Sequence, residues 1–206
     1  MRTHAGDSRT ASIPDVAVSI IVPVYNAAAT LGATLLSVQR QAHAAWEVIV
    51  IDDGSSDATA QVAKAFAQHD CRIRLISTGH TGVSAARNRG IAEARYDWLL
   101  FLDGDDTIAE SHLLELTRLL VHDPTIDIAY GGWIRTDEQG SPISRVYLPT
   151  VAEVRSSITQ GCLLTIHACI VRRSLVEKAG LFDTSLSHCE DWDLWYRLIV
   201  SGTKLG

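Results

Sequence analysis

The chain has 206 residues, 47% of them hydrophobic, and a formal net charge of −6 at pH 7. This length and apolar content allow one sizeable buried core, so we expect a single folded domain. The acidic balance and the lack of a long Lys and Arg run argue against nucleic acid as a partner, and no apolar segment reaches the roughly 18–20 residues that a membrane span requires.

Strands and helices are predicted to alternate along the chain after a polar tail at residues 1–15. Alternation at this spacing is typical of an α/β fold with a mostly parallel sheet covered on both faces. The hydrophobic patterns predict strands at 16–24, 46–51, 71–76, 98–102 and 126–133, and helices at 27–41, 57–68, 83–93 and 111–121.

The pattern is less regular beyond residue 133. We expect a turn at 137–141, a short strand at 168–171, and helices at 151–157, 174–179 and 191–200. The last residues, 201–206, are typical of an approach to a further strand, which suggests a fragment of a longer protein.

Three carboxylates follow the apolar strand at 98–102 within four positions: Asp103, Asp105 and Asp106. Such close carboxylates raise one another's pKa unless a cation lies between them. Because side chains alternate along a strand, Asp103 and Asp105 can converge on one ligand, and Gly104 allows the backbone to bend. Oxygen ligands favour a hard ion such as Mg²⁺ or Mn²⁺, although an acidic turn without a ligand is the plainer alternative.

Polar segments that follow the predicted strands belong at one edge of the sheet. Ligands of open α/β sheets bind beyond the carboxyl ends of the strands, so residues 23–26, 52–55, 77–82 and 103–106 should share one rim. In the second of these segments, Asp52 or Asp53 could accept hydrogen bonds from a base or ribose. A tight turn with a helix cap at Ser55 or Ser56 explains that segment equally well.

A helix is predicted to start at Gly82, and Arg87 places a positive charge about one turn into that helix. This combination favours phosphate, whereas an amphipathic surface helix with a solvated arginine is the alternative. The segment is not a dinucleotide fingerprint, because Gly79 and Gly82 lack the Gly-x-Gly-x-x-Gly spacing and follow the third strand.

Glu190 and Asp191 begin the last predicted helix. Carboxylates in a first turn are often partners of the helix dipole, but beside a metal site one of them could act as a general base. The neighbouring His188 and Cys189 have no second cluster with which to form a metal site.

Together these segments resemble the family 2 glycosyltransferases of the GT-A fold, over roughly residues 16–202. The likeness rests on five motifs in order: Pro23-Val24-Tyr25-Asn26, Asp52-Asp53-Gly54-Ser55, Gly82-Val83-Ser84-Ala85-Ala86-Arg87-Asn88, Asp103-Gly104-Asp105-Asp106 and Glu190-Asp191. The resemblance implies one C-terminally truncated GT-A (Rossmann-like) domain, with a nucleotide-binding half at 16–106 and an incomplete acceptor-side half at 107–206. It implies transfer of a sugar from a nucleotide-diphosphate sugar, usually a UDP-sugar, to an acceptor hydroxyl with inversion and with Mn²⁺ or Mg²⁺.

The resemblance also implies roles on the nucleotide side. Asp53, with Pro23, Tyr25 and Asp52, would hold uracil and ribose, and Arg87 would lie near the nucleotide.

For the chemistry, the resemblance implies that Asp105 binds the metal directly. Asp103 would lie beside it and meet the ribose or a metal-bound water. Asp191 would be the base, and Glu190 would support the acceptor, an unidentified sugar or glycan.

A phosphatase of the haloacid dehalogenase type is the main alternative, because Asp103-x-Asp105-x-Thr107 after an apolar strand satisfies its nucleophile motif. Asp103 would then attack phosphorus and Asp105 would be the acid or base. However, that motif normally ends the first core strand, and three strand–helix units precede it here. A non-catalytic domain that binds nucleotide-sugars is the second alternative.

The spacing of the cysteines indicates the cellular compartment. Cys71, Cys162, Cys169 and Cys189 show no Cys-x-x-Cys spacing, so neither a zinc site nor a disulfide scaffold is indicated. Reduced thiols are the default for such a chain. We therefore expect a cytoplasmic protein, peripheral at the inner membrane face and without an integral membrane segment.

Overall fold

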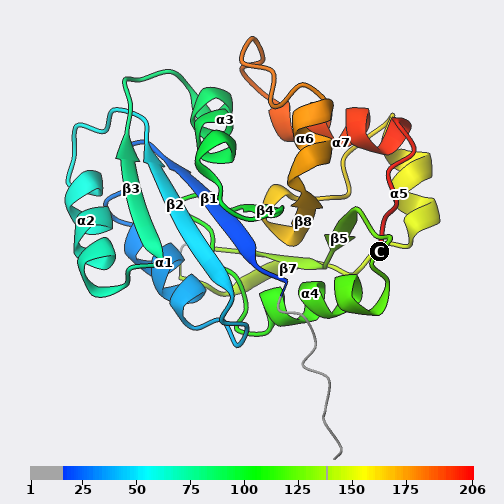
Figure 1. The fold of residues 1–206 in the computed structure, drawn as a ribbon, viewed down its shortest axis with the longest axis horizontal. Helices are drawn as coiled ribbons and strands as arrows, with labels where there is room; N and C mark the ends of the chain where they lie inside the picture. Colours follow the sequence, from blue (N-terminus) through cyan, green and yellow to red (C-terminus); the bar gives the residue numbers. More distant parts are fainter. Residues whose placement is uncertain (1–15, 138) are drawn as a thin grey trace, which may run out of the picture.

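The computed structural model of the protein describes residues 16–137 and 139–206, so the predicted polar tail lies outside it. Within these residues, six strands form a central sheet that is flanked by helices (Figure 1). In spatial order the strands are β3 (Ile73–Ser77), β2 (Trp46–Asp52), β1 (Val18–Val24), β4 (Trp98–Phe101), β8 (Cys169–Arg172) and β5 (Ile128–Tyr130).

The sheet is mostly parallel, as predicted. Strands β1 to β4 run parallel to one another, whereas β8 is antiparallel to both of its neighbours. The insertion of β8 between β4 and β5 brings the last third of the chain beside the carboxylates that follow β4. The helices are α1 (Leu31–Gln39), α2 (Thr59–His69), α3 (Val83–Glu93), α4 (His112–His122), α5 (Val151–Ser157), α6 (Arg173–Lys178) and α7 (Glu190–Val200).

Helices cover both faces of the sheet, which explains the continuous apolar strands. On β1, Ile20 and Val22 pack in one core with α1, α2 and α4, while Ile21 packs in the other core with α3, α6 and α7. Ser19 is the polar exception on β1, and it donates a hydrogen bond to the buried Glu47 carboxylate at 2.8 Å.

The single strand predicted at 126–133 is wrong. Gly131 and Gly132 separate β5 from β6 (Trp133–Thr136), which leaves the main sheet and pairs with β7 (Pro142–Val146) as a hairpin. A Cβ atom on Gly132 would lie 2.8 Å from the Val146 carbonyl oxygen, so this close approach requires glycine. The predicted turn at 137–141 joins the two hairpin strands, although residue 138 lies outside the described residues.

Two expectations about chain ends and caps have different outcomes. Leu205 forms a parallel bridge with Ile128, so the last residues do run alongside β5. The expected N-cap at Ser55 or Ser56 is wrong, because α2 begins at Thr59, where Asp57 accepts a hydrogen bond from the Thr59 amide at 2.9 Å.

None of the helices in the described ranges is long and apolar enough to cross a membrane.

Candidate active site

A cavity of about 630 Å³ opens at the carboxyl ends of β1, β2 and β4. Its position follows the rule for open α/β sheets, because the polar segments after these strands meet there. Asp52 and Asp191 do not line this cavity. The other predicted site residues do: Pro23, Tyr25, Asp53, Arg87, Asp103, Asp105 and Glu190.

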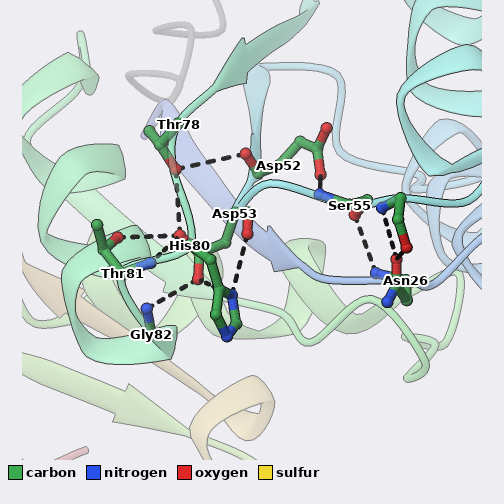
Figure 2. Close-up of polar contacts among 9 residues, drawn as sticks. Asn26, Asp52, Asp53, Ser55, Thr78, His80, Thr81 and Gly82 are labelled. Carbon is green, nitrogen blue, oxygen red and sulfur yellow. Dashed lines mark hydrogen bonds and ion pairs between the residues drawn. The ribbon is translucent and has the colours of Figure 1, made fainter.

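Asp53 organises the loop between β3 and α3 (Figure 2). One carboxylate oxygen accepts hydrogen bonds from the Thr81 amide at 2.8 Å and the Thr78 hydroxyl at 3.2 Å, and the other accepts from the Gly82 amide at 2.8 Å. Burial raises the pKa of Asp53, but these hydrogen bonds together outweigh it and hold the pKa below its usual value. The carboxylate is therefore ionised, and the protein itself already uses much of its accepting capacity.

Asp52 is buried and shapes the turn after β2 rather than the cavity. Its carboxylate accepts a hydrogen bond from the Ser55 amide at 3.0 Å. The Ser55 hydroxyl in turn accepts a hydrogen bond from the Asn26 backbone amide at 2.9 Å (Figure 2). The Asn26 side-chain oxygen accepts from the Ser56 backbone amide at 2.8 Å. The loops after β1 and β2 are thus held together at the rim.

Tyr25 and His80 stack against each other at the mouth of the cavity, with ring centroids 4.2 Å apart and planes 29° apart. Tyr25 is 50% exposed, so its ring offers apolar surface to a ligand. His80 also lies 3.2 Å from the Asp53 carboxylate through Nδ1. The pair gives the cavity an aromatic wall beside a carboxylate.

Arg87 connects the two ends of the site. Its side chain is 3% exposed, and its two terminal nitrogens donate to Glu190 at 2.6 Å and to Asp103 at 2.8 Å. Burial disfavours its charge, but the two carboxylates raise the pKa of Arg87 above its usual value. Burial likewise raises the pKa of Glu190, but the hydrogen bond from Arg87 reverses this and lowers it. Arg87 and Glu190 are therefore both charged at neutral pH.

Asp105 follows β4 and is exposed as a whole residue, but partial desolvation of its carboxyl, the largest influence, and the charges of Asp106 and Asp103 raise its pKa. Gly104 is required beside it, because a Cβ atom there would lie 2.6 Å from a Val24 methyl carbon. Asp106 points to a different partner, since its carboxylate lies 2.9 Å from His167 Nδ1.

The carboxylates of Asp103 and Asp105 fit a hard divalent ion, because both offer oxygen ligands and the neighbouring negative charges of Asp103 and Asp106 disfavour the ionised form of Asp105 when no cation is present. In the described parts of the chain, no group of three or more His, Cys, Asp and Glu residues could hold an ion. A Mg²⁺ or Mn²⁺ ion held by one or two carboxylates usually completes its shell with substrate phosphates and water.

Asp191 lies one residue into α7, beside but not within the cavity. Burial, the largest influence, and the charge of Glu190 raise the pKa of its carboxyl, while Arg87 and the Trp192 amide oppose the shift. The side chain is half-buried. A carboxylate with a raised pKa is a stronger base than a carboxylate with the ordinary pKa of aspartate.

The family model described as "Glycosyl transferase family 2" matches residues 19–180. The chain belongs to this family. The resemblance predicted from the five motifs is thereby confirmed.

Relatives at moderate identity agree with the family assignment. The chain is 31% identical over 190 residues to UDP-Glc:alpha-D-GlcNAc-diphosphoundecaprenol beta-1,3-glucosyltransferase WfgD of Escherichia coli, over 90% of this chain and 70% of WfgD. It is 29% identical over 188 residues to the uncharacterized glycosyltransferase EpsJ of Bacillus subtilis (strain 168), over 84% of this chain. The chain spans 53% of the length of EpsJ.

Solved structures share the fold. TarS residues 1–349 of S. aureus, in complex with UDP-GlcNAc, match with a TM-score of 0.73 and 22% identity, over 92% of this chain and 55% of that one. The mannosyltransferase PcManGT from Pyrobaculum calidifontis, in complex with GDP-Man and Mn²⁺, matches with a TM-score of 0.70 and 21% identity, over 91% of this chain and 53% of that one. The predicted GT-A fold is confirmed.

Several residues in and around this cavity were not predicted as site residues from the sequence. Asn88 exchanges two hydrogen bonds with the Phe182 backbone, at 2.8 and 2.9 Å, and so anchors the segment that leads to α7. Its place in the motif with Arg87 was the available signal. His80 lies in the segment 77–82, which was expected at the rim, and His167 gave no signal because its partner Asp106 is 61 positions away.

Proposed function

We propose that the chain transfers a sugar from a nucleotide-diphosphate sugar, by preference a UDP-sugar, to an acceptor hydroxyl with inversion at the anomeric carbon. One observation carries this proposal: a single cavity joins the Tyr25 ring and the Asp53 loop to Asp103, Asp105 and the start of α7. The names of similar proteins support the donor class, since WfgD is named for UDP-Glc and solved relatives contain UDP-GlcNAc or GDP-Man.

The nucleotide belongs at the Tyr25 end of the cavity. Uracil would stack on the exposed ring of Tyr25, with Pro23 at its edge, and Asp53 would accept from the base or ribose with the capacity that its loop leaves free. Asp52 contributes by fixing the turn that carries Asp53. The nucleotide-binding half at 16–106 supplies most of the cavity wall, and the acceptor-side half at 107–206 adds Glu190.

Asp105, with Asp103, would hold Mn²⁺ or Mg²⁺. When bound, the ion supplies stabilisation of the negative charge that develops on the leaving diphosphate. Asp103 keeps its orientation because Arg87 donates to it at 2.8 Å.

Asp191 acts as the base that takes the proton from the acceptor hydroxyl. Its half-buried position and raised pKa suit this task, because a base works best when its pKa approaches the working pH. Glu190, fixed by Arg87, positions the start of α7 and contacts the acceptor. A lipid-linked acceptor, which the name of WfgD specifies for WfgD, would bring the protein to the membrane face expected for it.

The phosphatase alternative requires Asp103 as a free nucleophile. Instead, its carboxylate lies 2.8 Å from a buried, charged guanidinium. That pairing stabilises the carboxylate and weakens it as a nucleophile.

Calorimetry with UDP and GDP, each with and without Mn²⁺, tests the proposal. We expect at least one of them to bind wild-type protein in a metal-dependent manner and the Asp105→Ala variant to lose that dependence. Asp97→Ala is the matched control, because Asp97 is an exposed aspartate that precedes the other end of β4. Unchanged affinity in Asp105→Ala contradicts the metal assignment, and hydrolysis of generic phosphate esters supports the phosphatase.

A further inference from the structure

Large apolar side chains are exposed on the β6–β7 hairpin and on the loop that follows it. Ile134 is 51% exposed, Ile143 62%, Tyr147 82% and Leu148 60%. Single exposed apolar side chains are common on proteins, but a group of large ones on one short element usually marks a contact with a partner or a membrane. Neither the sequence motifs nor the proposed reaction uses these four side chains.

The pairing of the two strands brings apolar and cationic side chains to one face. Ile134 pairs with Arg145 across the hairpin, and directly opposed residues of an antiparallel pair share a face. Tyr147 comes two positions after Arg145, directly beyond β7, so it continues that face. Ile143 lies at the irregularity in the strand register. The high exposure of these side chains shows that no described element covers them.

The loop that carries Tyr147 and Leu148 is held against the hairpin. A Cβ atom on Gly132 would lie 3.4 Å from the Leu148 amide nitrogen and 3.6 Å from the Tyr147 carbonyl carbon, so the loop backbone packs closely on Gly132. The Tyr130 hydroxyl donates to the Pro149 carbonyl at 2.8 Å. The exposed side chains therefore belong to an anchored loop, and they are presented to the outside before any partner arrives.

The charges on the hairpin are opposite in sign to the net charge of the protein, which is −6. The only ionisable side chains of β6 and β7 are Arg135 and Arg145, both of them exposed, and no ion pair between described residues involves either. Asp137 and Glu153, at the margins, accept hydrogen bonds from backbone amides of their own turns. Apolar side chains combined with free arginines complement an anionic lipid surface.

We use the name hairpin surface for the six side chains of this region: Ile134, Arg135, Ile143, Arg145, Tyr147 and Leu148. A second copy of the chain fits it poorly, because a stable interface takes about 20–30 residues from each partner. In a symmetric dimer the same patch meets itself, so the arginines of both copies would come close without a counter-charge. A bilayer needs only a few apolar side chains, which enter its headgroup region while arginines contact the anionic groups.

We propose that the hairpin surface docks the protein on an anionic lipid bilayer, with its four apolar side chains in the headgroup region and its two arginines on anionic headgroups. A cavity of about 450 Å³ is lined by both Ile134 and Asp105, so docking brings the bilayer beside the site after β4. A lipid-linked acceptor would then be close to that site. The inference itself stands on the exposed surface and does not depend on the proposed transfer reaction.

Sedimentation with lipid vesicles tests the proposal. The vesicles consist of phosphatidylcholine alone or of an equimolar mixture with the anionic phosphatidylglycerol. The main variant combines Tyr147→Ser with Leu148→Ser. The matched control combines Tyr196→Ser with Leu36→Ser, which changes an exposed tyrosine on α7 and an exposed leucine on α1. If the main variant melts at a lower temperature than the wild type, Ile143→Ser takes its place.

We expect the wild type and the control to bind the mixed vesicles equally. The main variant should lose at least about tenfold in partition to them, because two apolar side chains no longer enter the headgroup region. Arg145→Ser should lose about fivefold on the mixed vesicles and nothing on phosphatidylcholine alone, as one cation near an anionic surface usually contributes this much. Added salt should weaken binding of the wild type, because it screens the arginines.

The proposal is overturned if the wild type binds neither kind of vesicle, or if the main variant binds as the wild type does. An equal loss in the control also overturns it, since binding then does not depend on the hairpin surface. Sedimentation velocity examines the second copy: a wild-type dimer that the main variant converts to a monomer, without vesicle binding, would replace the bilayer with another copy of the chain.

Calorimetry with UDP and GDP on the same samples separates this proposal from the proposed function. Nucleotide affinity should be unchanged in the main variant, because neither Tyr147 nor Leu148 lines the nucleotide cavity. If the wild type binds vesicles but neither nucleotide, the proposed function fails and the docking surface stands. If it binds a nucleotide but no vesicle, the docking surface fails alone.

Discussion

Arg87 and Glu190 are 103 positions apart in the chain, yet the guanidinium of one lies 2.6 Å from the carboxylate of the other. The same guanidinium binds Asp103 at 2.8 Å. One buried cation therefore fixes the end of β4 and the start of α7 relative to each other. The residues proposed to bind the metal and to act as the base follow β4 and begin α7. Substitution of Arg87 therefore tests how the site is held together.

Replacing Arg87 with Met should destabilise the fold by about 3 kcal/mol, because it leaves two partly buried carboxylates close together without their partner. Arg87→Lys should rescue only part of this, since one ammonium cannot reproduce the two-pronged contact. Urea denaturation measures both. Arg89→Met is the control, because Arg89 lies on the same helix in an exposed pair with Glu93 and should cost less than about 0.5 kcal/mol. Equal losses at the two positions would show that Arg87 has no special structural role.

Asp191→Asn should leave donor affinity nearly intact and reduce turnover by about 10²–10⁴-fold, because the amide cannot take the acceptor proton. Single-turnover transfer kinetics and calorimetry with the donor separate the two effects. Asp193→Asn serves as the control on the same helix, where Asp193 is paired with Arg197 at 2.6 Å. Wild-type turnover in Asp191→Asn would remove Asp191 from the mechanism.

The pH dependence of turnover should report the burial of Asp191. The base must be ionised, so the rate falls when pH drops through its pKa, and a raised pKa moves this loss to a higher pH than an ordinary aspartate would give. The measurement is kcat between pH 4 and 8 with saturating donor, acceptor and Mn²⁺. A kcat that stays constant down to about pH 4, where an exposed aspartate titrates, is incompatible with this assignment.

Asp70 and Arg72 offer a test of stability away from the site. Arg72 binds the Asp70 carboxylate at 2.8 Å and lies over the Trp46 ring, and the hydrogen bond holds the pKa of Asp70 at about 2. A lowered folded-state pKa contributes stability above the unfolded value near 4, and this is lost as pH falls toward 2. Asp70→Asn should therefore cost about 1 kcal/mol at pH 7 and less at pH 3, as urea denaturation can show. A cost that does not change between these pH values would exclude the ion pair as its cause.

Local hydrophobic patterns and helix start signals were sufficient to predict most of the helices and strands. The bounds of α3 and α5 agree with the prediction, because each helix begins after a clear start signal, Gly82 for α3 and Thr150 for α5. The hairpin of β6 and β7 was not predicted, since its strands are largely exposed and Gly131 and Gly132 redirect an apolar run out of the sheet. Such a bend depends on packing against Val146, which a local pattern does not contain.

The site was predictable to the extent that strand ends determine it. The carboxyl ends of parallel strands meet at one edge, so motifs after β1, β2 and β4 could be placed together from the sequence. Contacts between distant segments were not predictable in this way: the pairing of Asp106 with His167, the stacking of Tyr25 on His80, and the anchoring of Phe182 by Asn88. These contacts depend on which segments the insertion of β8 and the loop before α7 bring close.

The most direct test of the central claim is the release of free nucleoside diphosphate from UDP-glucose, UDP-GlcNAc and GDP-mannose by the purified chain, with Mn²⁺ or with EDTA. We predict that at least one of these donors is cleaved, that EDTA abolishes the reaction, and that Asp191→Asn slows it while Asp193→Asn does not. Cleavage of none of the three, together with hydrolysis of p-nitrophenyl phosphate that depends on Asp103, would contradict the account.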